Sequence, residues 1–157
     1  MVRRLVAAAA VCCALTGVVV QAVPGAAAAG AGPLKVIAQD PDPAPAGEVA
    51  TVRALVVNEG SARSEAFTVV VTLPEGVTPE GPFFPENCSA ERQTVTCHYR
   101  RGLPAGNTAT AIVPARLAAD ATGVLEGGTV TVGEDTAPGA LDTGSFAVTV
   151  SDEVLTE

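Results

Sequence analysis

NCSAERQTVTCHYRRGLPAG, residues 87–106, is the stretch on which the predicted fold depends. It holds Cys88 and Cys97, the only cysteines after the first 29 residues. The polar residues between them predict a turn, made either of the two residues 92–93 or of the four residues 91–94. In both cases the cysteines face each other across a β-hairpin. The two-residue turn places them at a non-hydrogen-bonded pair, where cross-strand side chains approach most closely.

A disulfide between Cys88 and Cys97 follows if the chain is exported, because thiols oxidise outside the cytosol. Closing a loop of about ten residues contributes roughly 2.5 to 3 kcal/mol through the entropy of the unfolded chain. The alternative, a metal bound by both cysteines and His98, lacks a fourth ligand and the usual close spacing. We therefore predict a structural hairpin without metal or cofactor.

Outward from the hairpin, the chain alternates between apolar and polar residues. The strongest segment is EVATVRALVVN, residues 48–58. A period of two puts one set of its side chains on the inner face of a sheet, namely Ala50, Val52, Ala54 and Val56, while Thr51 and Arg53 point outward. Further strands are predicted at residues 34–38, 67–73, 108–117, 129–132 and 146–150.

Proline and glycine mark the connections. The prolines of residues 40–47 should prevent ladder pairing and make a stiff connector. Pro114 should turn the end of its strand into an edge or a bulge. Since no helical period extends beyond a turn after residue 29, we predict an all-β fold, a single immunoglobulin-like β-sandwich of about seven or eight antiparallel strands.

The ends of the chain suggest export. Arg3 and Arg4 precede an apolar run over residues 5–20, and small residues at 26–29 fit a cleavage site near Ala29. A membrane anchor is the rival interpretation, but Gly17 and Pro24 break the apolar run. The predicted organisation is a signal peptide (1–29), an N-terminal strand with a proline-rich connector (30–47), the sandwich (34–151) and an acidic tail (152–157). The protein is expected to be extracellular and secreted.

Charge narrows the range of partners. Without Arg3 and Arg4, seven Lys and Arg residues stand against seventeen Asp and Glu residues, a net charge near −10. So acidic a chain should repel phosphate backbones and anionic lipid surfaces. We expect no nucleic-acid partner and, after signal removal, no membrane partner.

Several short motifs occur in a characteristic order. They are Pro45-Ala46-Gly47, Asn58-Glu59-Gly60, TLPEGV at residues 72–77, TVTC at 94–97, LPAG at 103–106 and GTVTV at 128–132. In this order the chain resembles the bacterial conserved repeat domain of unknown function, the eleventh so catalogued. Val71 and Asp142-Thr143 depart from its pattern. The resemblance implies a secreted, immunoglobulin-like module with a structural or adhesion role and no catalytic residues.

Candidate functional residues are few. His98 is the only histidine, and no nucleophile elbow or oxyanion motif accompanies it, so we predict that the protein is not an enzyme. Phe83 and Phe84, framed by prolines, either close the end of the core or form a hydrophobic hook for a partner.

The predicted function is non-catalytic, with a structural, adhesion or protein-binding role toward a protein or cell-surface partner. The alternative is a small secreted ligand-binding protein or a protease inhibitor. Arg92, Arg100 and Arg101 are the arginines expected to contact a partner in either case.

Overall fold

The computed structural model describes residues 33–136 and 139–152. The predicted signal peptide and, apart from Asp152, the predicted acidic tail lie outside these residues. The described part contains strands and no helix, and hence no helix that could cross a membrane. The strands are β1 (Leu34–Ala38), β2 (Ala44–Pro45), β3 (Val49–Asn58), β4 (Phe67–Thr72), β5 (Val77–Pro79), β6 (Cys88–Glu91), β7 (Thr94–Tyr99), β8 (Thr108–Leu117), β9 (Val124–Glu134) and β10 (Asp142–Ser151).

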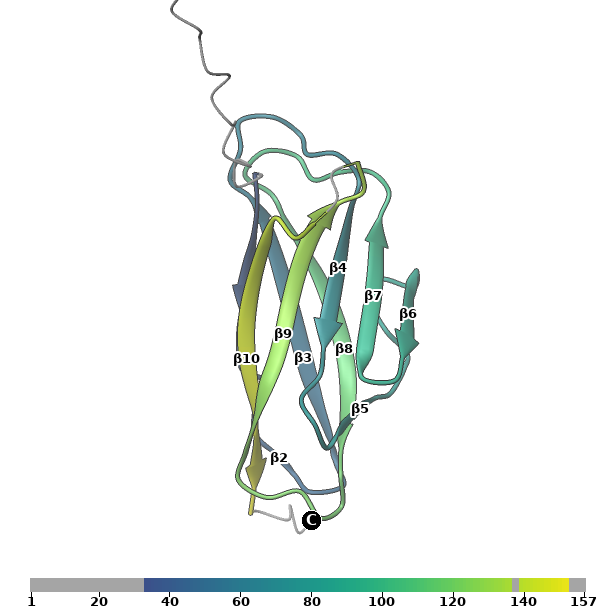
Figure 1. Cartoon of the computed structure of the whole chain (residues 1–157), viewed down its shortest axis with the longest axis vertical. Helices are drawn as coiled ribbons and strands as arrows, with labels where there is room; N and C mark the ends of the chain where they lie inside the picture. Colours follow the sequence, from purple (N-terminus) through teal and green to yellow (C-terminus); the bar gives the residue numbers. More distant parts are fainter. Residues whose placement is uncertain (1–32, 137–138, 153–157) are drawn as a thin grey trace, which may run out of the picture.

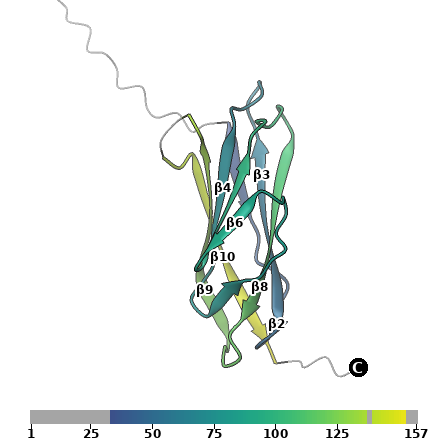
Figure 2. The same cartoon turned by 90° about the vertical axis from the view of Figure 1, so that its right-hand side faces the viewer.

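These strands form two facing sheets. One has four strands in the order β1-β3-β8-β5, and the other has six in the order β2-β10-β9-β4-β7-β6. In Figure 1 the six-stranded sheet lies in front, and β3 and β8 run behind it. Figure 2 shows β3 and β8 on the opposite side of the molecule from β4 and β9. The prediction of an all-β sandwich is confirmed.

The core lies between the sheets and is built by the predicted alternation. Ala50, Val52, Ala54 and Val56 of β3 are all at most 3% exposed, whereas Arg53 between them is exposed. The inward set from β4 and the following residue is equally buried, namely Phe67, Val69, Val71 and Leu73. Each such aliphatic or aromatic side chain contributes roughly 1.5 to 3 kcal/mol on leaving water, so this alternation supplies most of the driving force for folding.

Two short strands, β2 and β5, were not predicted, and β2 also departs from the predicted antiparallel pairing. Ala44 and Pro45 pair in parallel with Val150 and Ser151 of β10, at the edge of the six-stranded sheet. The prediction that prolines keep residues 40–47 out of the ladder is therefore wrong at its end. Proline lacks an N–H, but an edge strand needs donors on one side only, so a short proline-containing strand is tolerated there.

Pro114 also lies elsewhere than expected. It pairs with Thr51 in β8, an interior strand that has β3 on one side and β5 on the other. Its carbonyl accepts the N–H of Glu80, 2.9 Å away, just past the end of β5. In a β-strand, the N and O atoms of one residue point to the same side. The nitrogen of Pro114, which carries no hydrogen, therefore faces β5, at the point where the β5–β8 ladder has ended. The β8 strand therefore continues to Leu117.

At one end of the sandwich, Asn58 organises the loops. Its side chain is wholly buried; Nδ2 donates to the carbonyls of Ala62 (2.8 Å) and Leu103 (2.6 Å), and Oδ1 accepts the N–H of Gly60 at 2.9 Å. Its backbone bonds to Asn107 as well, with N···O 3.0 Å. The last residue of the predicted strand 48–58 thus ties the β3–β4 loop to the β7–β8 loop.

Candidate functional site

The outer face of the four-stranded sheet is set by the same alternation that builds the core. Since the inward residues of β3 are its even-numbered ones, Arg53, Leu55 and Val57 point outward. In β8 the outward set is Thr108, Thr110, Ile112, Pro114 and Arg116. This surface, which we call the four-stranded face, therefore carries large apolar side chains where water would favour polar ones.

Cross-strand pairing places these apolar side chains in neighbouring rows. Ile37 of β1 pairs with Leu55, and Phe84 forms an isolated bridge with Ile112, which in turn pairs with Arg53. Paired residues share one side of a sheet, so Ile37 and Phe84 lie on the same surface. Ile37 is 42% exposed and Phe84 56%, and the described residues include only one other exposed large hydrophobic, Val124. Two of these three side chains thus belong to the four-stranded face.

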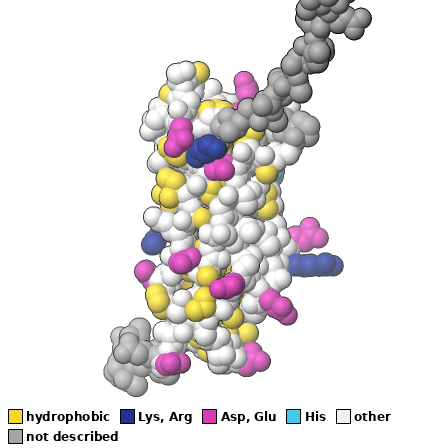
Figure 3. Space-filling view, turned by 60° about the vertical axis from the view of Figure 1, so that its left-hand side comes forward, with side chains coloured by type: hydrophobic (Ala, Val, Ile, Leu, Met, Phe, Trp, Pro, Cys, Tyr) yellow, Lys and Arg dark blue, Asp and Glu magenta, His cyan; other side chains and the backbone are white. Residues whose placement is uncertain are grey.

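The strands of this face carry only basic charges, but two of the three are paired with carboxylates: Lys35 Nζ lies 3.9 Å from Asp142 Oδ1, and Arg116 bonds to Glu80. The strands β1, β3, β5 and β8 contain Lys35, Arg53 and Arg116 and no Asp or Glu, although the chain carries a net charge of −8. Figure 3 shows how acidic side chains outnumber basic ones on another side of the molecule. Within the described residues, Arg53 takes part in no ion pair and no side-chain hydrogen bond. Its guanidinium is free to meet an acidic group.

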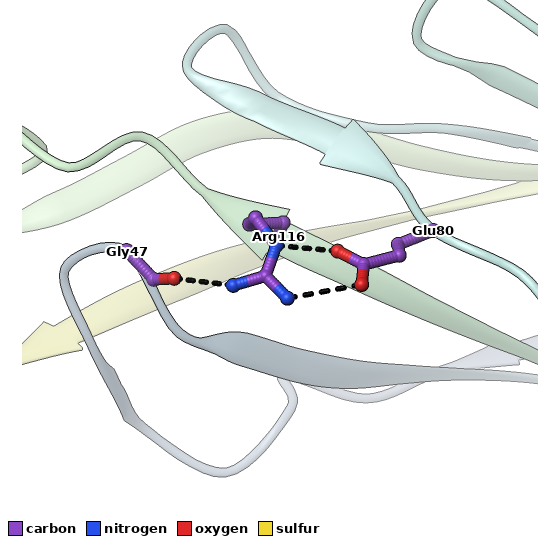
Figure 4. A network of polar contacts seen from close by, with 3 residues as sticks. All are labelled: Gly47, Glu80 and Arg116. Atoms are coloured by element: carbon purple, nitrogen blue, oxygen red, sulfur yellow. Dashed lines mark hydrogen bonds and ion pairs between the residues drawn. The ribbon is translucent and has the colours of Figure 1, made fainter.

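Arg116 is held in place at the end of this face (Figure 4). It donates to both carboxylate oxygens of Glu80, at 2.5 and 2.9 Å, and to the carbonyl of Gly47 at 2.6 Å. The hydrogen bonds from Arg116 lower the pKa of the Glu80 carboxyl. The same bonds, together with the negative charge of Glu80, raise the pKa of Arg116. The network fastens β5 and the turn before β3 to β8, so the face has a fixed border.

The predicted hairpin is present with the shorter of the two turns. Cys88 pairs with Cys97 and forms the disulfide, with Cα atoms 4.0 Å apart. Glu91 pairs with Thr94, which leaves Arg92 and Gln93 as the turn. The disulfide leaves no thiolate for the metal alternative. No group of three or more His, Cys, Asp or Glu side chains in the described residues is placed to hold a metal ion.

The two phenylalanines divide between the alternatives proposed for them. Phe83 packs against the core, and Phe84 extends into solvent on the four-stranded face. The backbone of Phe84 bonds to Ile112 in both directions, at 3.0 and 2.8 Å, so consecutive side chains point to opposite sides. One residue closes the core, and the other is available as a hook.

The three candidate arginines are not brought together with Phe84. Arg92 lies in the turn before β7, whereas Arg100 and Arg101 follow the other end of that strand. Arg100 and Arg101 line a depression of about 380 Å³ with His98, Tyr99 and Leu103. The structure thus separates the predicted partner-binding residues into three locations.

His98 belongs to a polar chain that does not match a hydrolytic triad. The hydroxyl of Thr68 donates to Asp135 Oδ1 at 2.8 Å and lies 2.9 Å from His98 Nδ1. Since its single proton goes to Asp135, Nδ1 of His98 must be the donor in the second contact. The hydroxyl here stands between histidine and carboxylate, whereas a catalytic triad requires the imidazole in the middle.

Sequence reasoning missed Ile37, Arg53, Leu55 and Ile112. The signal was available, because these residues occupy outward positions of the predicted strands and yet three of them are large and apolar. The absence of acidic residues from those segments, apart from Glu48 at the start of one, was a second signal. The sequence does not show which strands are neighbours in the sheet. It therefore could not show that these residues share one surface.

Comparison with known proteins shows which solved structures have a similar fold. No family model matches the chain, and no curated protein matches its sequence. A solved type I cohesin, the seventh of ScaB from Pseudobacteroides cellulosolvens, superposes with a TM-score of 0.53 at 13% identity over 79% of this chain and 96% of the cohesin. The third cohesin of ScaC from Acetivibrio cellulolyticus, solved in complex with the ScaB dockerin, gives 0.52 at 12% identity, over 74% and 99%. At these identities the likeness concerns the fold: this chain is a β-sandwich similar to cohesins.

Proposed function

We propose that the protein is a secreted, non-catalytic protein-binding module that contacts its partner through the four-stranded face. The observation that carries this proposal is the row of Phe84, Ile112 and Arg53, which combines an exposed aromatic, an apolar neighbour and an arginine without a described ionic partner. Aromatic and arginine side chains are the groups that most often dominate the binding energy of protein interfaces.

The similarity of the fold to cohesins also supports a protein-binding role. One similar sandwich, the cohesin of Acetivibrio cellulolyticus, was solved bound to a dockerin, so this architecture supports protein recognition in that case. Export rests on residues 1–29, and a disulfide suits an oxidising compartment. An adhesion role, and membership of the conserved repeat domain named above, stay predictions.

A protease inhibitor is the weaker alternative at Arg92. A peptide that docks along an enzyme's strand edge is extended. Arg92 has φ 54°, in the left-handed region, because it occupies the two-residue turn. Its backbone is therefore not shaped as an extended, substrate-like segment.

Capture with matched variants tests the proposal. The exported protein, immobilised, is exposed to culture filtrate and cell-wall extract of the producing organism, and retained proteins are compared with those retained by Phe84→Ala and Arg53→Glu. We expect both variants to lose the proteins that the wild type retains.

Two control variants distinguish binding through the four-stranded face from nonspecific hydrophobic binding and from an effect of net charge. Val124 is 56% exposed, the same as Phe84, and lies on β9 of the other sheet, so Val124→Ala should retain the same proteins as the wild type. Arg92→Glu makes the same charge change as Arg53→Glu at the hairpin turn and should also be neutral. Equal retention by Phe84→Ala, Arg53→Glu and wild type would refute the proposed face.

A further inference from the structure

A depression at the loop end of the sandwich combines an apolar floor with a basic rim. It has a volume of about 380 Å³ and lies where β7 ends and β4 begins. Its floor comes from Phe67, Tyr99, Leu103 and Pro85, and its polar lining residues are Asn87, His98, Arg100 and Arg101. This volume is within the range typical of sites for small organic molecules.

The floor is rigid because each of its parts is fixed by contacts made elsewhere. The rings of Phe67 and Tyr99 stack in parallel with centroids 4.6 Å apart, and the Tyr99 hydroxyl donates to the carbonyl of Thr110 at 2.9 Å. Burial raises the pKa of Tyr99 to about 12, which keeps this hydroxyl a donor. The aromatic pair is therefore in place before any ligand arrives.

The loop that forms the opposite wall is held as firmly. The N–H of Leu103 donates to Ser64 Oγ at 2.8 Å, and its carbonyl accepts from Ser64 N at 2.9 Å and from Asn58 Nδ2 at 2.6 Å. A Cβ on Gly102 would lie 1.9 Å from the carbonyl oxygen of Ser64, so only glycine allows the two segments to approach. A ligand would thus meet a preformed site and avoid an ordering cost.

The rim is basic in an acidic protein. Arg100 and Arg101 are exposed, and neither takes part in a described ion pair or side-chain hydrogen bond. Arg63 is next to them, with Nη1 3.0 Å from the carbonyl of Gly102. No Asp or Glu lines the depression, although Glu134 pairs with Phe67 and the Asp135 carboxylate accepts a hydrogen bond from Thr68, which contacts His98. Three of the seven Lys and Arg residues after residue 29 therefore gather at this end.

We propose that this depression binds a small carboxylic acid whose apolar ring or short chain covers the partly exposed Tyr99 and Pro85 and whose carboxylate meets Arg100 and Arg101. A guanidinium pairs with a carboxylate through two parallel hydrogen bonds, so one arginine can fix the acid while the other adds charge. A bare anion would leave the apolar floor uncovered, and an uncharged ligand would leave both guanidinium groups unmatched. This site is separate from the four-stranded face and does not rest on the proposed function.

Titration of the exported, disulfide-bonded protein with phenylacetate, followed by amide chemical shifts, tests the site. We expect saturable shifts centred on residues 98–103. Acetate has the charge without the ring, and phenylacetamide has the ring without the charge. Each should bind at least tenfold more weakly than phenylacetate.

The variants are chosen on exposed residues so that folding is retained. Arg100→Gln with Arg101→Gln should weaken phenylacetate binding tenfold or more, whereas Arg92→Gln, which changes an exposed arginine at the far end of β7, should leave it unchanged. Three outcomes would overturn the proposal: no saturable shift with phenylacetate, equal shifts with acetate, or an equal loss in Arg92→Gln, which would indicate an effect of overall charge only.

Discussion

At the scale of single residues, buried polar groups determine the loop end of the sandwich. Asn58 satisfies three partners with its side chain, from Gly60, Ala62 and Leu103, in a fully buried position. Removing one member of such a set leaves donors and acceptors without partners, which costs more than the bonds contribute. This residue therefore fixes both the end of β3 and one wall of the depression.

Asn58→Ala should lower the free energy of unfolding by about 3 kcal/mol, because the Leu103 carbonyl and the Gly60 N–H lose a buried partner. Urea denaturation measures the change. Asn107→Ala is the matched control, since Asn107 is exposed in the same loop cluster and its side chain makes no described hydrogen bond; its effect should stay within about 0.5 kcal/mol. A similar loss in both variants would contradict this role of Asn58.

Tyr99 allows a direct measurement, since it is the only tyrosine and the chain has no tryptophan. Burial raises its pKa from 10.0 to about 12. The contribution of the neutral phenol to stability is therefore complete below pH 10 and is lost as the pH rises through 12. Ultraviolet absorbance of the phenolate in native protein should give a midpoint near 12, and urea-unfolded protein one near 10. Coincident midpoints would show that the ring is solvated.

At the scale of elements, the β6–β7 hairpin is attached to the sandwich from outside. β6 is an edge strand whose residues after Cys88 are all exposed, while Val95 and Cys97 of β7 belong to the core. The disulfide therefore joins an edge strand with little burial of its own to a strand that the core already holds. It stabilises chiefly by restricting the unfolded chain.

Replacing both cysteines, Cys88→Ala with Cys97→Ala, should lower the free energy of unfolding by about 2.7 kcal/mol, the loop entropy of ten residues. Alanine is chosen because Cys97 is fully buried and a serine hydroxyl would lack a partner there. Denaturation of the variant and of reduced wild type should agree. Amide spectra should change near residues 88–97 and stay dispersed elsewhere; a general collapse of dispersion would show that the hairpin is needed for the whole fold.

At the scale of the whole molecule, the two sheets close on each other along the β1–β10 side. The N–H of Val36 in β1 donates to Asp142 Oδ2 at 2.9 Å, and the N–H of Ala147 in β10 donates to Asp40 Oδ1 at 2.8 Å. Gly144 makes this closure possible, because a Cβ there would lie 2.7 Å from Cβ of Ala38. Two carboxylates thus occupy backbone donors on the edge strand β1 and on the part of β10 that β2 does not cover, where the donors could otherwise pair with another chain.

Asp40→Ala with Asp142→Ala should cost about 2 kcal/mol, one hydrogen bond to a charged acceptor in each strand, and should raise the tendency to associate. Thermal unfolding measures the first effect and light scattering the second. Asp120 is exposed and its side chain makes no described hydrogen bond, so Asp120→Ala should change neither. If the double variant matched this control, the carboxylates would have no part in the closure.

By itself, the sequence determined the local pattern of this protein. Alternation identified the strand of residues 49–58 and its inward face, and the cysteine spacing identified the disulfide and both possible turns. These features depend on the period of a strand and on contacts within about ten residues of each other, so they can be derived from adjacent residues.

Only the tertiary structure decided the features that depend on pairing between strands far apart in the sequence. It made Pro45 part of an edge strand and Pro114 part of an interior one, buried Asn58, and divided Phe83 from Phe84. It also joined Ile37, Arg53 and Phe84 into one surface, although they are spread over 48 positions of the chain. The physical reason is that alternation tells which side of a strand faces inward, whereas the neighbours of that strand are selected by the packing of the whole core.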